Sequence, residues 1–123
     1  MITGVVNSSL DATIRLLVSG PEALEQEIEA TIDTGFSGSL SLPSSLIAAL
    51  GLPFRRRGRA ILADGSDSLF NIYEATVLWD QAPRRIGVHA ADTDPLVGMN
   101  LLHHYELCVQ IVNEGKVRIS MLT

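Results

Sequence analysis

The chain has 123 residues, of which 46% are apolar, and a formal net charge of −5. This length predicts one domain, residues 1–123, whose single core would gain further burial from association with another chain. The acidic balance argues against a nucleic-acid partner. No apolar run approaches the ~20 residues that a membrane-spanning helix needs. The N-terminus also lacks the basic-then-apolar pattern of a signal peptide, so we expect no membrane association and a cytoplasmic location.

Short segments of alternating apolar and polar residues in the first half of the chain predict β-strands. One helix stands out among them, because Pro43 is well placed to open it and Gly51 to end it. The basic cluster Arg55–Arg59 is expected in a solvated loop or at a strand edge. The elements predicted here are strands at 2–7, 12–18, 25–32 and 40–42 and the helix at 43–50.

The second half contains a tight turn at Asp64-Gly65, a pair typical of β-hairpins. The elements predicted here are strands at 59–63, 69–74 (continuing through 75–79) and 84–90, a short helix at 99–103, and a final hairpin of 105–112 with 116–121. No segment repeats another. The whole pattern predicts a mostly β protein, a closed antiparallel barrel with one or two short helices.

Cysteine and histidine offer little sign of chemistry. The single Cys108 lies in an apolar run, which favours a buried and inert thiol. His89, His103 and His104 lack the spacing of a metal site, and we interpret them as surface or helix-end residues. We therefore expect no metal and no cofactor.

The most informative segment runs from Ala30 to Ser37, where an apolar strand ends in Asp33, Thr34 and Gly35. A carboxylate at a strand end is held rigidly, and glycine lets the backbone turn tightly and approach a ligand. Taken alone, Asp33 and Thr34 could simply form a turn that bonds its own backbone. Two later segments follow this loop in the chain and bear on the choice: Ala63-Asp64-Gly65-Ser66 and Leu96-Val97-Gly98.

These three segments, in this order, resemble retropepsin-like aspartic proteases, in particular the small enzymes encoded by bacteria and archaea. The resemblance covers nearly the whole chain and implies the β-barrel of the retroviral proteases. Phe36 departs from the small residue usual in the retroviral enzymes and is expected to narrow the substrate groove. The resemblance implies that Asp33 is the catalytic residue and that its loop is supported by Thr34, Gly35, Phe36 and Ser37. It also implies a flap formed by Ala63, Asp64, Gly65 and Ser66. The segment that crosses behind the loop would be Leu96, Val97 and Gly98.

Aspartic protease chemistry needs two carboxylates that share one proton, and the chain has only one Asp-Thr-Gly. The resemblance therefore implies a homodimer in which two copies of Asp33 meet at a two-fold axis and activate a water against a peptide or protein substrate. Thr34 would bond across that axis. The apolar first and last strands, with Ile2 and Ile119, would leave unpaired edges that invite association, and the resemblance implies that the two termini pair between subunits.

Two other functions compete with peptide hydrolysis. A non-catalytic module could keep the same fold and serve in peptide binding or dimerisation. The loop Ile32–Gly38 also faintly resembles the phosphate-binding loop of actin-like ATPases, but 123 residues cannot build the two large lobes of that fold. Peptide cleavage measured against nucleotide binding would separate the three functions.

Overall fold

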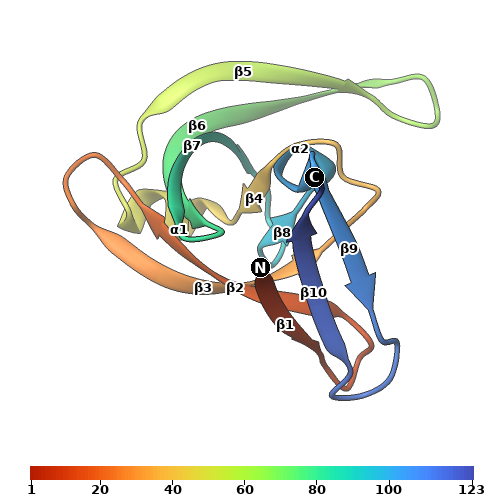
Figure 1. Ribbon diagram of the computed structural model, residues 1–123. Helices are drawn as coiled ribbons and strands as arrows, with labels where there is room; N and C mark the ends of the chain where they lie inside the picture. Colours follow the sequence, from red (N-terminus) through yellow and green to blue (C-terminus); the bar gives the residue numbers. More distant parts are fainter.

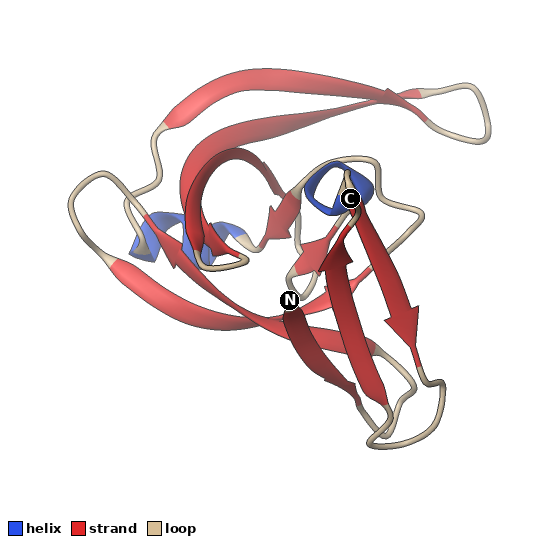
Figure 2. Cartoon of the chain, viewed as in Figure 1, coloured by secondary structure: helices blue, strands red, loops and turns tan.

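The computed structural model describes residues 1–123 as β-strands with two short helices (Figures 1 and 2). The strands are β1 (Ile2–Val6), β2 (Ala12–Ser19), β3 (Glu25–Ile32), β4 (Leu40–Leu42), β5 (Phe54–Ile61), β6 (Asp67–Trp79), β7 (Ala82–Ala90), β8 (Leu96–Val97), β9 (Tyr105–Val109) and β10 (Lys116–Met121); the helices are α1 (Ser44–Ala49) and α2 (Met99–Leu102).

Six strands close a barrel in the order β2-β3-β8-β4-β7-β6, because β6 pairs with β7 and also with β2. Neighbouring strands are antiparallel except for β3 with β8 and β4 with β7, which are parallel. This arrangement confirms the expected closed, mostly antiparallel barrel with two short helices. Neither helix is long and apolar enough to span a membrane.

Apolar residues alternate with polar ones along the strands, and the apolar side chains form the core. On β3, Ile28 and Ala30 point inward while Glu27 and Glu29 stay exposed. β4 lies between β7 and β8 and is buried along its whole length. Helix α1 covers one side of the core with Ile47, and Pro43 sits just before the helix as its N-cap, with an extended backbone. The predicted strand bounds of β3 and β4 are confirmed to the residue.

Two extensions leave the barrel. The β5–β6 hairpin arches over it and ends in a projecting tip, while β1, β10 and β9 form an arm on another side (Figure 1). The chain termini lie near one another, and the ammonium group of Met1 pairs with Asp80 at 2.7 Å (Figure 1).

The terminal strands pair with each other within the chain, which corrects the expectation that their edges are unpaired and associate between subunits. β10 lies between β1 and β9, and Ile2 is in register with Ile119. Val117 and Ile119 are fully buried in the core. The free edges of the sheet are therefore β5 and β9, not the first and last strands. Cys108 lies on the edge strand β9 and is exposed, so the expectation of a buried thiol is wrong.

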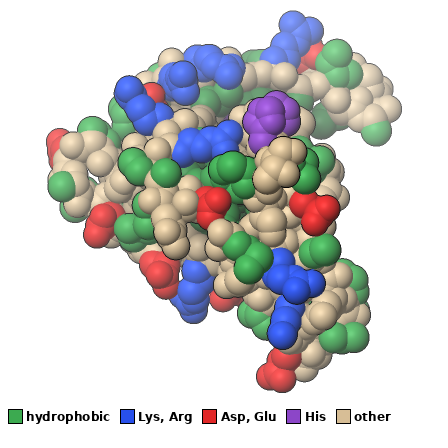
Figure 3. Space-filling view, viewed as in Figure 1, with side chains coloured by type: hydrophobic (Ala, Val, Ile, Leu, Met, Phe, Trp, Pro, Cys, Tyr) green, Lys and Arg blue, Asp and Glu red, His purple; other side chains and the backbone are tan.

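The basic cluster Arg55–Arg59 forms most of the edge strand β5. Of the two expected environments, a solvated loop or a strand edge, the structure shows the strand edge. Basic side chains gather along the upper rim of the molecule, over β5 (Figure 3). Arg59 pairs with Asp67 at 2.8 Å. Arg56 and Arg57 are exposed and have no carboxylate partner within salt-bridge distance.

Candidate functional site

Asp33 follows directly after β3 and is held by the backbone of β8. The two strands run parallel, with Ile32 in register with Val97. The amide of Thr31 donates to the carbonyl of Pro95 at 3.0 Å, and the amide of Asp33 donates to the carbonyl of Val97 at 2.9 Å. Val97 lies on the barrel strand β8 and Pro95 directly precedes it, so the backbone of Asp33 is bonded to the barrel.

The segment after β8 passes behind the Asp33 loop and is bonded to it. Gly98 donates to the carbonyl of Ser39 at 3.0 Å, Met99 to that of Phe36 at 2.8 Å, and Asn100 to that of Gly38 at 3.1 Å. The Asn100 side chain adds a bond of 2.7 Å to the Ser39 hydroxyl. A Cβ on Gly98 would lie 2.2 Å from the Gly38 carbonyl oxygen, so only glycine permits this approach.

The carboxylate of Asp33 is tied only to its own loop. Its Oδ1 accepts the Gly35 amide at 2.9 Å, and Phe36 donates to the Asp33 carbonyl at 3.1 Å. This is the local turn that the tripeptide alone predicts. Oδ2 has no hydrogen-bond partner in the chain, and no cationic group pairs with the carboxylate. One oxygen is therefore available to a water or a ligand.

A groove of about 480 Å³ lies beside Asp33, under the β5–β6 hairpin. Half of its lining residues are apolar, and Asp33 is its only acidic group. Such a surface suits an apolar side chain fixed by a few polar contacts. The groove is lined by Asp33, Gly35, Phe36, Ser41, Ser68, Leu69, Phe70, His89, Ala90, Ala91, Thr93 and Leu96.

Three rings form a column along this groove, which we call the ring column: Phe36, His89 and Phe70. Phe36 meets His89 edge-on at 5.1 Å between ring centroids, and Phe70 stacks on His89 at 4.5 Å. The ring of Phe70 occupies the space that a Cβ on Gly58 would fill. The column therefore reaches from the Asp33 loop to β5, and Phe36 lies in the groove wall.

His89 is the site residue that the sequence does not reveal: we expected a surface or helix-end residue, and the structure places it half-buried in the groove wall. Burial lowers the pKa of His89, and the nearby charge of Arg56 lowers it further. His89 follows the core residue Val88 on β7, so alternation alone places it on the other face of that strand. Only the pairing of β7 with β6, which sets His89 beside Ile72, brings it against Phe70.

The hairpin turn expected to act as a flap lies outside the groove. The residues Ala63 to Ser66 are exposed, and Gly65 takes a φ of +86°. Hydrogen bonds from Ser66 to the Asp64 carboxylate shape the turn and lower the Asp64 pKa. The hairpin residues that reach the groove are Ser68, Leu69 and Phe70.

Thr34 faces a second depression of about 620 Å³, separate from the Asp33 groove. It borders α2 and β9 and includes Met99, Leu102 and Leu107. The Thr34 side chain is exposed, and its hydroxyl makes no hydrogen bond within the chain. His103 and His104 stack at 3.9 Å at the edge of this depression. No group of three His, Cys, Asp or Glu residues is placed to hold a metal ion.

Comparison with known proteins supports the architecture. No protein-family model matches the chain, and no curated protein does. Among solved structures, the chain resembles a retropepsin-like aspartic protease from Rickettsia conorii with a TM-score of 0.60 and 17% sequence identity. The match covers 99% of this chain and 91% of that one. The chain therefore has a retropepsin-like fold.

Proposed function

We propose that the protein is an aspartic endopeptidase whose active site forms between two copies of the chain. Asp33 is the catalytic residue of each copy. The observation that carries this proposal is the position of Asp33: a carboxylate with one free oxygen, fixed by β8 and opening into a half-apolar groove. A rigid carboxylate beside a groove is the arrangement that activation of a water against a bound peptide requires.

The chemistry requires Asp33 of the partner subunit. Two carboxylates close together share one proton, since like charges at short range do not both ionise readily. The ionised group takes a proton from the water as the water attacks the peptide carbonyl, and the protonated group donates to the carbonyl oxygen. The tetrahedral intermediate then collapses: the group that took the proton of the water gives it to the departing amine, and the other group takes back a proton from a hydroxyl of the intermediate as the carbonyl re-forms. The two carboxyl groups act as one coupled unit.

The depression beside Thr34 is the surface that we assign to dimerisation. It adjoins the Asp33 loop through Thr34, shares no lining residue with the substrate groove, and includes Met99, which is 48% exposed. Thr34 has a free hydroxyl for a bond across the axis. The C-terminal residues Met121 and Leu122 are also exposed and would extend the buried area.

The remaining parts of the site follow from the same proposal. Gly35 accepts the substrate backbone at close range, and Ala63 to Ser66 close over the peptide as a flap after binding. The exposed Ile61 and Leu62 next to the turn give the flap an apolar surface for the substrate or the partner hairpin. No cofactor takes part. We place this reaction in the cytoplasm, with one domain per chain.

The test is cleavage of a mixed peptide library by the purified protein, followed by mass spectrometry. We expect cleavage by the wild type and none by Asp33→Asn at equal dimer content. Cleavage by both proteins would refute the proposal. If peptides bind but neither protein cleaves them, the second candidate function holds, a peptide-binding or dimerisation module. The groove itself favours that second candidate over a purely structural role.

A further inference from the structure

One edge of the sheet is open along the whole of β5. The strand pairs with β6 on one side only, so its other side presents unbonded N–H and C=O groups along residues 54–61. Every residue of the strand is exposed except Gly58, which packs against the Phe70 ring. β5 contains no proline, so each residue keeps its N–H. An extended segment of another chain can therefore add to this edge as a further strand.

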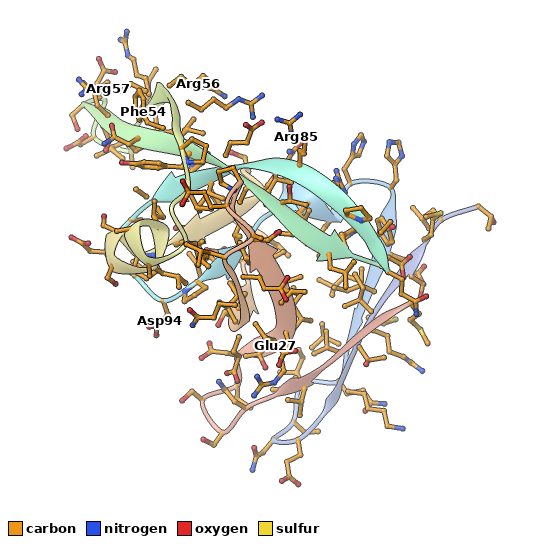
Figure 4. All side chains as sticks on the ribbon, turned by 90° about the vertical axis from the view of Figure 1, so that its left-hand side faces the viewer. Glu27, Phe54, Arg56, Arg57, Arg85 and Asp94 are labelled. Carbon is orange, nitrogen blue, oxygen red and sulfur yellow. The ribbon has the colours of Figure 1, made fainter.

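Arginine dominates this open edge. β5 carries Arg55, Arg56, Arg57 and Arg59 in a chain whose net charge is −5. Arg59 pairs with Asp67, whereas the other three arginines have no carboxylate partner within salt-bridge distance. Arg56 and Arg57 leave β5 in different directions (Figure 4). Because side chains alternate between the two faces of a strand, an added strand would meet unpaired positive charge on both of its faces.

The charge of β5 selects the kind of strand that can pair with it. A charged edge resists pairing with the same edge of another copy, which protects the protein from self-association. The same charges attract a strand of opposite sign. The other free edge of the chain, β9, carries Glu106 as its only acidic residue and does not match four arginines. The complementary partner is therefore an acidic segment of another protein and not a second copy of this chain.

Nucleic acid matches this edge less well than a peptide does. Proteins bind it mainly through contacts to successive phosphates. The basic cluster covers only residues 55–59 of an acidic chain, so a longer polyanion would meet repulsion beyond the cluster. An extended polypeptide, in contrast, has main-chain groups with the same spacing as those of β5.

Arg57 stands where this edge meets the barrel. It lines a depression of about 350 Å³ together with Ser44, Asn71 and Asp92. Asp92 does not reach Arg57 at salt-bridge distance, so the guanidinium group stays available to a ligand. The depression shares residues of β6 with the Asp33 groove, but no residue of β5 lines the groove itself. A segment docked on β5 would lie beside the groove without entering it.

We propose that the free edge of β5 binds an acidic, extended segment of a partner protein by strand addition. Main-chain hydrogen bonds to β5 hold the segment in an extended conformation. The unpaired guanidinium groups of Arg56 and Arg57 accept its carboxylates, one on each face of the added strand. The proposal does not depend on peptide hydrolysis.

The test is fluorescence anisotropy with a labelled peptide that is as long as β5 and made of glutamate, threonine and valine. The first control peptide replaces each glutamate by glutamine. We expect the glutamate peptide to bind about tenfold more tightly, as three exposed ion pairs provide. The second control keeps every charge but is N-methylated at its four central residues, which removes main-chain donors on both edges of the peptide. It should bind about tenfold more weakly, through the loss of at least two hydrogen bonds.

Protein variants locate the binding on β5. Arg56→Gln and Arg57→Gln should each weaken binding of the glutamate peptide about two- to fivefold. The matched control is Arg118→Gln, which removes one charge from an exposed position on β10 and should leave the affinity unchanged. Asp33→Asn should also bind as the wild type does, because the edge lies outside the groove. The thermal midpoint of each variant monitors its folding.

Several results would overturn the proposal. These are no binding of the glutamate peptide, equal binding of the glutamate and glutamine peptides, and a wild-type affinity in folded Arg56→Gln and Arg57→Gln. A changed affinity in Asp33→Asn would place the peptide in the groove instead. Tighter binding of a short oligothymidine than of the glutamate peptide would make the edge a nucleic-acid site. Failure of the protein to cleave any peptide would refute the peptidase function and leave this binding site intact.

Discussion

Gly98→Ala should strongly destabilise the protein, because the crossing behind the Asp33 loop leaves no space for a methyl group. The new Cβ would lie 2.2 Å from the Gly38 carbonyl oxygen and 2.6 Å from the Phe36 ring. Gly98 has an extended backbone, with φ −106° and ψ 178°, which alanine also adopts. The penalty is therefore steric, and the backbone conformation adds little.

The size of the loss in stability follows from the separation that Gly98→Ala would force between the crossing segment and the Asp33 loop. Separating the two segments strains the packing, typically by about 1–3 kcal/mol. It also weakens the bonds from Met99 to Phe36 and from Asn100 to Gly38, which are 2.8 and 3.1 Å long. Each such bond contributes about 0.5–1.5 kcal/mol. We expect a loss of about 2–5 kcal/mol in the free energy of unfolding, a large share of the ~5–15 kcal/mol of an ordinary domain.

Urea unfolding followed by tryptophan fluorescence measures this loss, since Trp79 is buried in the core. The matched control is Gly35→Ala in the same site, where the nearest atom to a new Cβ is Asp33 Oδ1 at 3.3 Å. The control should stay within about 1 kcal/mol of the wild type. A Gly98→Ala protein as stable as the Gly35→Ala protein would refute the packing of the crossing segment described above.

Three further predictions concern the site. Asp33→Asn should abolish peptide hydrolysis while preserving the circular dichroism spectrum, because an amide cannot share a proton or activate water; an active, folded variant would exclude the mechanism. Thr34→Ala should raise the dimer dissociation constant about fivefold or more, as expected for a lost hydrogen bond, and sedimentation that matches the wild type would contradict the role of Thr34. Because the pKa of folded His89 lies below its ordinary value of 6.5, the unfolded chain binds more protons in the window just below that value. Wild-type stability should therefore fall as pH drops through this window, and a His89→Phe protein with the same slope would contradict the burial of His89.

The local elements were predictable from the sequence because their signals are local. The alternation of apolar and polar residues marks β3, and the Pro43 to Gly51 interval marks α1 to within a residue or two at each end. Asp64-Gly65 marks the hairpin turn, where Gly65 does adopt a positive φ. The closed barrel also followed from the count of short strands together with the resemblance.

What the sequence did not predict depends on strand pairing over long distances. The sequence predicts the hairpin partner of β10, but not that β1 covers its other edge, with Ile2 against Ile119. Cys108 sits in an apolar run, yet the outer face of an edge strand leaves it exposed. His89 joins Phe36 and Phe70 only through the register of β6 with β7. Each of these outcomes is set by residues far away in the chain.

The most direct test of a site shared between two chains is specific activity measured together with sedimentation over a dilution series. If each chain holds half of the site, activity per chain should fall as the dimer dissociates, and the two curves should share one midpoint. The same series on Thr34→Ala should shift both curves to higher concentration. A protein that sediments as a monomer while its specific activity stays constant would contradict the account of Asp33 as one of a pair.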